Sequence, residues 1–145
     1  MPLDIVGGVC ARLAAASGFP AMLATFEGLP AILSGDVLPE NLADVVETKP
    51  VCIVNSPFYD EDTSDLTAQR RDVKLHLLFY AKTGGAGLDL LTATERAKEI
   101  FRNVDQATFS TGKLEASFVS GPLRAPTEDP SIEGRLLTLS LTIKE

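Results

Sequence analysis

The glycine-rich segment Thr83–Gly87 could in principle bind phosphate, because it joins a predicted strand to a predicted helix. A nucleotide-binding loop of this kind needs either Gly-Lys-Ser/Thr at its end or the spacing Gly-x-Gly-x-x-Gly. Neither pattern is present, and Lys82 precedes the loop, where a phosphate-binding lysine would follow it. The sequence therefore favours a turn or a contact loop, in which Gly84 and Gly85 are candidate partner-contacting residues.

The acidic run Asp60–Asp65 could in principle bind calcium through carboxylate oxygens. An EF-hand loop also needs a central glycine and a terminal glutamate, and the run contains neither. We interpret it as a polar, exposed loop whose charges are solvated until a partner arrives. Asp60, Glu61 and Asp62 are therefore candidate residues of a subunit or partner interface.

His76 is the only histidine, so a zinc site built from several histidines is excluded. A Ser-His-Asp set is not excluded by counting, but no Gly-x-Ser-x-Gly motif exists and His76 lies in the middle of a predicted strand. Cys10 and Cys52 lie in apolar segments without a Cys or His at metal-ligand spacing, which is typical of small buried hydrophobic residues. We expect no catalytic set, no metal and no cofactor.

The chain has 145 residues and a formal net charge of -7, which indicates one acidic domain covering residues 1–145. An acidic surface opposes binding to nucleic acid, because phosphate neutralisation requires Lys and Arg. It does not oppose the passage of DNA without adhesion. No basic leader precedes an apolar stretch, and no apolar run is long enough to cross a bilayer. We expect synthesis in a reducing cytoplasm and no membrane partner.

The pattern of apolar residues predicts an α+β fold, in which an antiparallel sheet of about four strands has helices packed on one face. Strands are predicted at Pro50–Asn55, which is continuously apolar and therefore central, and at three alternating segments, Arg71–Ala81, Lys113–Gly121 and Arg135–Ile143. Amphipathic helices are predicted at Leu3–Ser17 and Asp89–Val104, whereas Phe19–Glu47 is interrupted by prolines and indicates only short pieces. The predicted core between helix and sheet contains Phe79, Ile100, Phe101, Phe118, Leu139 and Leu141.

Two further segments are candidates for contact with a partner. Arg70 and Arg71 open a strand, and they are either solvated end charges or members of ion pairs with Asp60–Asp65 of a neighbouring subunit. The segment Gly121–Gly134 is long for a connection in a compact domain, and it contains three prolines and mixed charge. We interpret it as an arm that is mobile in the free subunit and ordered in an assembly. Its candidate contact residues are Leu123, Arg124 and Ile132.

The order of these elements resembles the tail terminator, or tail completion, proteins of long-tailed bacteriophages. The residues that carry the resemblance are the helix from Leu3, the strands Pro50–Asn55 and Val73–Tyr80, the helix containing Gly87, Ala93, Ala97, Ile100 and Phe101, and the strands Gly112–Val119 and Arg135–Ile143. The proline-punctuated segment Phe19–Glu47 departs from the pattern, which leaves the topology near the first strand open.

The resemblance implies a structural subunit without chemistry or cofactor. Such a subunit forms a ring, most often a hexamer, on the head-proximal end of the tail tube, where it stops tube growth and offers a surface to the head. The implied partners are further copies of the chain, the tail tube protein and the head–tail connector protein, with DNA passing through the channel and the virion tail or neck as the location. The alternatives are a head–tail connector (neck) protein of the same virion, a small nucleotide-binding enzyme that uses the Gly84–Gly87 turn, and a monomeric binding module.

Overall fold

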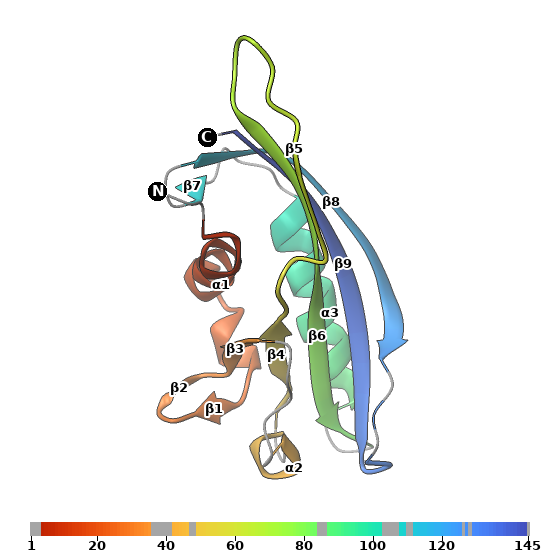
Figure 1. The fold of residues 1–145 in the computed structure, drawn as a ribbon. Helices are drawn as coiled ribbons and strands as arrows, with labels where there is room; N and C mark the ends of the chain where they lie inside the picture. Colours follow the sequence, from red (N-terminus) through yellow and green to blue (C-terminus); the bar gives the residue numbers. More distant parts are fainter. Residues whose placement is uncertain are drawn as a thin grey trace.

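A curved β-sheet that wraps around two helices forms the body of the protein (Figure 1). The computed structural model describes residues 4–35, 42–46, 49–83, 87–102, 108–109, 112–125, 127 and 129–144. The elements in chain order are α1 (Ile5–Ala15), a 3₁₀ turn (Pro20–Met22), β1 (Thr25–Phe26), β2 (Leu29–Pro30), β3 (Ile32–Ser34), α2 (Leu42–Val45), β4 (Val51–Val54), β5 (Tyr59–Asp62), β6 (Arg70–Lys82), α3 (Gly87–Arg102), β7 (Thr108–Phe109), β8 (Gly112–Ala125) and β9 (Ile132–Lys144).

The main sheet has seven strands in the described part of the chain, which is more than the predicted four. The strand order is β3-β4-β6-β9-β8-β7. β5 pairs with the same edge of β6 as β4 does, at the other end of that strand. All pairs are antiparallel except β3 with β4, and β1 and β2 form a separate small hairpin. The extra strands come from segments that had no clear strand pattern. The proline-punctuated segment supplies β3, the acidic run supplies β5 in place of the predicted loop, and Thr108–Phe109 supplies β7.

The two long central strands confirm the predictions from alternation. β6 pairs with β9 along its whole length, from Arg70 opposite Lys144 to Lys82 opposite Ile132. Val73, Leu75, Leu77 and Phe79 of β6 are buried together with Leu137, Leu139, Leu141 and Ile143 of β9. Because side chains alternate between the two faces of a strand, these residues form one continuous apolar face.

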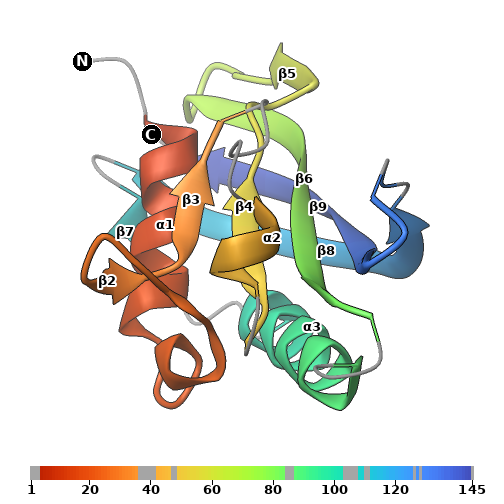
Figure 2. The same cartoon turned by 90° about the horizontal axis from the view of Figure 1, so that it is seen from below.

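Helices α1 and α3 cover that face, as the view from below shows (Figure 2). Helix α1 begins after Asp4, whose carboxylate accepts a hydrogen bond of 2.8 Å from the Gly7 amide and so caps the helix. Arg12 of α1 donates to the Ile100 carbonyl of α3 (3.1 Å), and Arg96 of α3 donates to the Ser17 carbonyl just beyond α1 (3.3 Å). An arginine of each helix therefore bonds a carbonyl at the carboxyl end of the other, where a positive charge is favourable.

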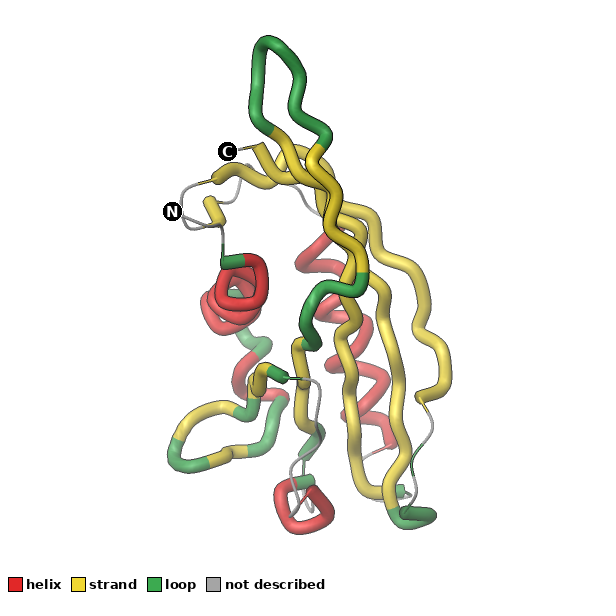
Figure 3. Tube along the Cα trace, in the orientation of Figure 1, coloured by secondary structure: helices red, strands yellow, loops and turns green. Residues whose placement is uncertain are grey.

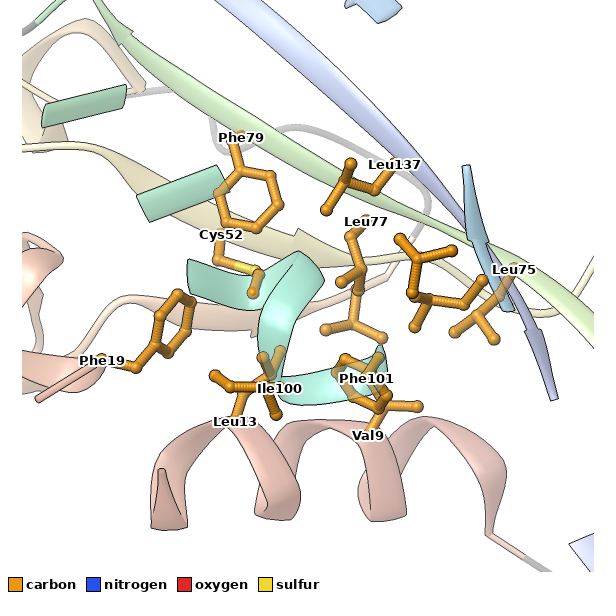
Figure 4. Packing of buried hydrophobic residues seen from close by; sticks show 14 of the residues in the cluster. Val9, Leu13, Phe19, Cys52, Leu75, Leu77, Phe79, Ile100, Phe101 and Leu137 are labelled. Carbon is orange, nitrogen blue, oxygen red and sulfur yellow. The ribbon is translucent and has the colours of Figure 1, made fainter. Parts of the chain in front are cut away.

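The main core lies between the two helices and the sheet (Figure 4). The apolar stripe of α3 is buried as predicted, with Phe101 fully enclosed near Val9 of α1 and Leu75 of β6. On α1 the buried residues are Ile5, Val9 and Leu13, while Val6 and Cys10 are only partly buried. Helical periodicity in the sequence predicts a face formed by Leu3, Val6, Cys10, Leu13 and Ala14, so the buried face of α1 is rotated relative to the predicted one. Val104, which was predicted to continue the α3 stripe, lies outside the described residues.

A second, smaller core lies on the opposite face of β4. There Leu42 and Val46, in and just after α2, pack with Val51, Ile53 and Tyr80. Cys52 and Val54, the alternating residues of β4, belong to the main core. The prediction of a central strand covered on both faces is confirmed for β4. The prediction that the helices pack on one face only is wrong for α2.

A β-bulge places Phe118 on the surface, although the sequence pattern predicts it in the core. Leu114 pairs with Ile143 and Ala116 with Thr142, so that Glu115 is an extra residue in β8. One extra residue exchanges the two faces of a strand. Leu114 before the bulge is therefore buried, whereas Phe118 after it is 68% exposed.

The predicted mobile arm Gly121–Gly134 is mostly regular strand. β8 continues to Ala125 and β9 starts at Ile132, with Leu123 opposite Leu136 and Ala125 opposite Gly134 (Figure 3). The continuation of β8 does not show in the sequence pattern, because a second irregularity lies between Ser120 and Leu123. It again exchanges which residues of β8 face the core.

Candidate assembly surface

The described residues contain no group of three or more His, Cys, Asp or Glu that could hold a metal ion. The ring of His76 lies against that of Phe58, with 4.5 Å between the ring centroids. Cys10 and Cys52 are both free, and burial raises the pKa of the Cys52 thiol, which disfavours the nucleophilic thiolate. Gly84 and Gly85, the candidate phosphate or contact residues, lie outside the described residues.

The most prominent surface feature is a hairpin that projects beyond the sheet (Figures 1 and 3). β4 and β5 pair with the same edge of β6, one after the other, so that the chain from Val51 to Asp62 runs beside β6. Amides of Asn55 and Phe58 continue the ladder between the two strands by donating to carbonyls of β6. The turn at 63–69 closes the hairpin, and we refer to these seven residues as the hairpin tip.

Hydrogen bonds hold the hairpin tip in one conformation. One carboxylate oxygen of Asp65 accepts from the Thr67 amide and hydroxyl (both 2.7 Å) and from the Ala68 amide (2.9 Å). Backbone bonds from Thr63 to Arg70 and from Asp65 to Ala68 close the turn. In contrast, the side chain of Leu66 is 106% exposed. The hydrogen-bonded turn therefore holds the apolar side chain of Leu66 in solvent.

Ion pairs connect the hairpin to itself and to the sheet. Arg71 pairs with Asp60 across β5 and β6, and its Nε lies 3.0 Å from an oxygen of Asp60. Arg70 contacts Glu115 of β8 (2.7 Å) and Asp65 of the tip (3.2 Å). Both arginines thus have carboxylate partners within their own chain, and a contact of either with a neighbouring subunit stays a prediction. Each pair is partly exposed, so its main consequence is the direction of the hairpin rather than a large gain in stability.

We expect the carboxyl group of Asp65 to titrate with a pKa of about 2, because the hydrogen bonds from Thr67 and Ala68 stabilise its ionised form. A pKa below that of the unfolded chain means that the turn is fully stabilised above about pH 4. The stabilisation is lost as the pH falls through the folded value. Carbon-detected NMR titration of Asp65 measures this directly, and the Thr67 and Ala68 amides should exchange faster as the group protonates. Asp65→Asn should abolish the pH dependence of that exchange.

The outer face of the sheet carries a shallow groove of about 360 Å³. Tyr59 of β5 and Phe118 of β8 form its sides, and the short side chains of Ser140 and Thr142 lie between them. Lys74 also lines it, with its ammonium 5.3 Å from the Tyr59 ring centroid. Aromatic side chains such as these two are enriched in protein interfaces relative to the rest of the surface.

The other predicted interface residues differ in how exposed they are to solvent. Asp60, Glu61 and Asp62 are exposed on β5, and Leu123 and Arg124 are exposed on β8, with Leu123 at 64%. Ile132, which was predicted to dock on a neighbour, is buried in the second core instead. The sequence analysis did not identify Leu66, Leu29 and Phe118 as exposed apolar residues of the surface. A single leucine within the polar stretch 60–69 was a usable signal for Leu66, but nothing local distinguishes Phe118 from a core residue.

Comparison with known proteins gives a structural match only. No family model matches the chain, and no curated protein sequence matches it. A chain in the solved structure of the virion of a native gene transfer agent particle superimposes with a TM-score of 0.71. The superposition covers 97% of this chain and 95% of that one, at 14% sequence identity. The two chains share a fold. In addition, none of the described helices combines the length and the apolar character that a membrane span requires.

Proposed function

We propose that the protein is a structural subunit of a phage-like virion, and that it acts there as the tail terminator. The observation that carries the proposal is the match of nearly the whole chain, in both directions, to a subunit of a gene transfer agent virion. At 14% identity this likeness concerns the fold, and the role is our inference from it.

The surface of the protein is consistent with a structural role. Its described part combines a projecting hairpin with an exposed aromatic groove, and the whole chain has a formal net charge of -7. A ring requires two different contact surfaces on each subunit, because its interfaces are heterologous. An acidic ring around a channel would let DNA pass without adhesion. In this proposal the subunit has no enzymatic activity, forms a ring on the tail tube and offers a surface to the connector.

A connector role in the neck of the same virion is the second candidate, and deletion of the chain from a particle that encodes it separates the two. Loss of a terminator should give tubes of uncontrolled length, because nothing caps the growing end. Loss of a connector should give tails of normal length that fail to join heads. Electron microscopy of the lysate measures both outcomes, and complementation with the intact chain is the control. Joined particles with normal tails in the deletion strain would contradict both roles.

A further inference from the structure

We propose that Leu66 at the hairpin tip inserts into an apolar hollow beside the β1–β2 hairpin of a second copy of this chain. The proposal deepens the proposed function, because it rests on the chain being a subunit that repeats in an assembly. It assigns one specific contact to that assembly.

The hollow has a volume of about 480 Å³ and is open to solvent on one side. Most of its lining residues are apolar and come from β1, β2, β3 and β4, namely Phe26, Leu29, Pro30, Ile32, Leu33 and Ile53, and Glu27 and Ser34 complete the lining. Leu29 on its rim is 69% exposed. Its size lies within the range of pockets that enclose small apolar groups.

The hairpin tip has the properties of an element that enters such a hollow. Leu66 is fully exposed, and the turn that carries it is held by the three hydrogen bonds to Asp65. Ordering of the tip on binding therefore costs little conformational entropy. Arg70 is shared between Asp65 and Glu115, and Glu27 lines the hollow, so the contact rests on the apolar side chain of Leu66 and not on charge attraction.

The tip and the hollow cannot meet within one molecule. The tip lies at one end of the sheet and the β1–β2 hairpin lies toward the other, and both views show them apart (Figures 1 and 2). When the contact between the tip of one copy and the hollow of the next is not returned, it is heterologous, and its repetition gives a ring or a filament. A reciprocal exchange of tips would instead close as a dimer.

The contact area is small. This favours a contact between copies that a template already holds next to each other. A seven-residue turn with one large apolar side chain buries far less than the ~1,200 Å² of a stable pairwise interface. An isolated pair would therefore dissociate readily. Copies held side by side on a tube end raise the effective concentration of each tip at its neighbour, so that many weak contacts act together.

The test is disulfide crosslinking of the double variant Leu66→Cys/Leu29→Cys, bound to purified tail tubes and oxidised with copper phenanthroline. All variants carry Cys10→Ser, because Cys10 is partly exposed, whereas the native Cys52 is buried. Both side chains are exposed, so folding should be preserved, which circular dichroism verifies. We expect a ladder of covalent oligomers that ends at the ring size, because each copy contributes one tip thiol and one hollow thiol. Each variant that carries only one of the two introduced cysteines should give dimers at most. Only monomers and dimers from the double variant would overturn the proposal.

The matched control is Leu66→Cys/Phe118→Cys, which pairs the same tip with an exposed apolar residue of the outer groove. A ladder from this pair, with none from the first, would place the tip in the groove and overturn the proposal. Leu66→Asp should reduce the amount of tube-bound protein by about tenfold or more, and Leu66→Met should not. Overlong tubes in the deletion strain without a ladder would leave the proposed function standing and remove only this contact.

Discussion

Phe101→Ala is expected to lower the free energy of unfolding by about 3–5 kcal/mol, because truncation of a fully buried phenylalanine loses transfer free energy and leaves a cavity. Phe101 has no exposed surface, and it packs in the main core between α1, α3 and the sheet. The guanidinium of Arg12 lies 5.6 Å from its ring centroid, so truncation also removes a partner of the residue that bonds α3. Urea unfolding followed by circular dichroism measures the change.

Phe118→Ala is the matched control for that measurement. It removes the same atoms from a side chain that is 68% exposed, so the change should lie within about 0.5 kcal/mol. The sequence places both phenylalanines in the core, Phe101 by helical periodicity and Phe118 by strand alternation, and the bulge at Glu115 is what exposes Phe118. Equal losses of unfolding free energy for the two variants would contradict the placement of Phe118 on the outer face of β8.

Gly121→Ala is expected to have the second-largest effect, a loss of about 2–5 kcal/mol of stability. The backbone of Gly121 has a φ of +108°, a conformation that L residues rarely adopt. An added Cβ would also lie 2.7 Å from the carbonyl oxygen of Leu136 on the paired strand. That oxygen belongs to the backbone of β9, so the contact cannot be relieved without displacing a central strand. Thermal and urea unfolding give the magnitude.

Gly18→Ala separates the two contributions. Gly18 also has a positive φ, +81°, but no atom lies within 4 Å of the position of its missing Cβ. It should therefore show only the conformational cost, about 1–2 kcal/mol. A larger loss for Gly18 than for Gly121 would contradict the close approach of β8 and β9 at the second irregularity. Amide exchange at residues 123–125 should rise in Gly121→Ala and stay unchanged in Gly18→Ala.

The candidate assembly surface depends on pairings that local sequence does not encode. The acidic run was predicted as a loop because its charges favour solvent, yet Tyr59–Asp62 forms β5 because β6 offers an unpaired edge there. Arg70 and Arg71 were considered for pairing across a subunit boundary. They instead contact carboxylates that the hairpin and β8 bring to them within one chain. Proximity between segments far apart in sequence is set by the fold.

The sequence by itself determined the elements whose burial is periodic. The alternation of β6 and β9, the apolar stripe of α3 and the continuous apolar run of β4 each record which faces are removed from water, and the structure confirms them. Only the tertiary structure decided the exposure of Phe118, the burial of Ile132 and the projection of Leu66. One extra residue in β8 inverts its faces without any change in composition. The position of the hairpin tip follows from the pairing of β5 with β6, which becomes favourable only once the sheet has formed.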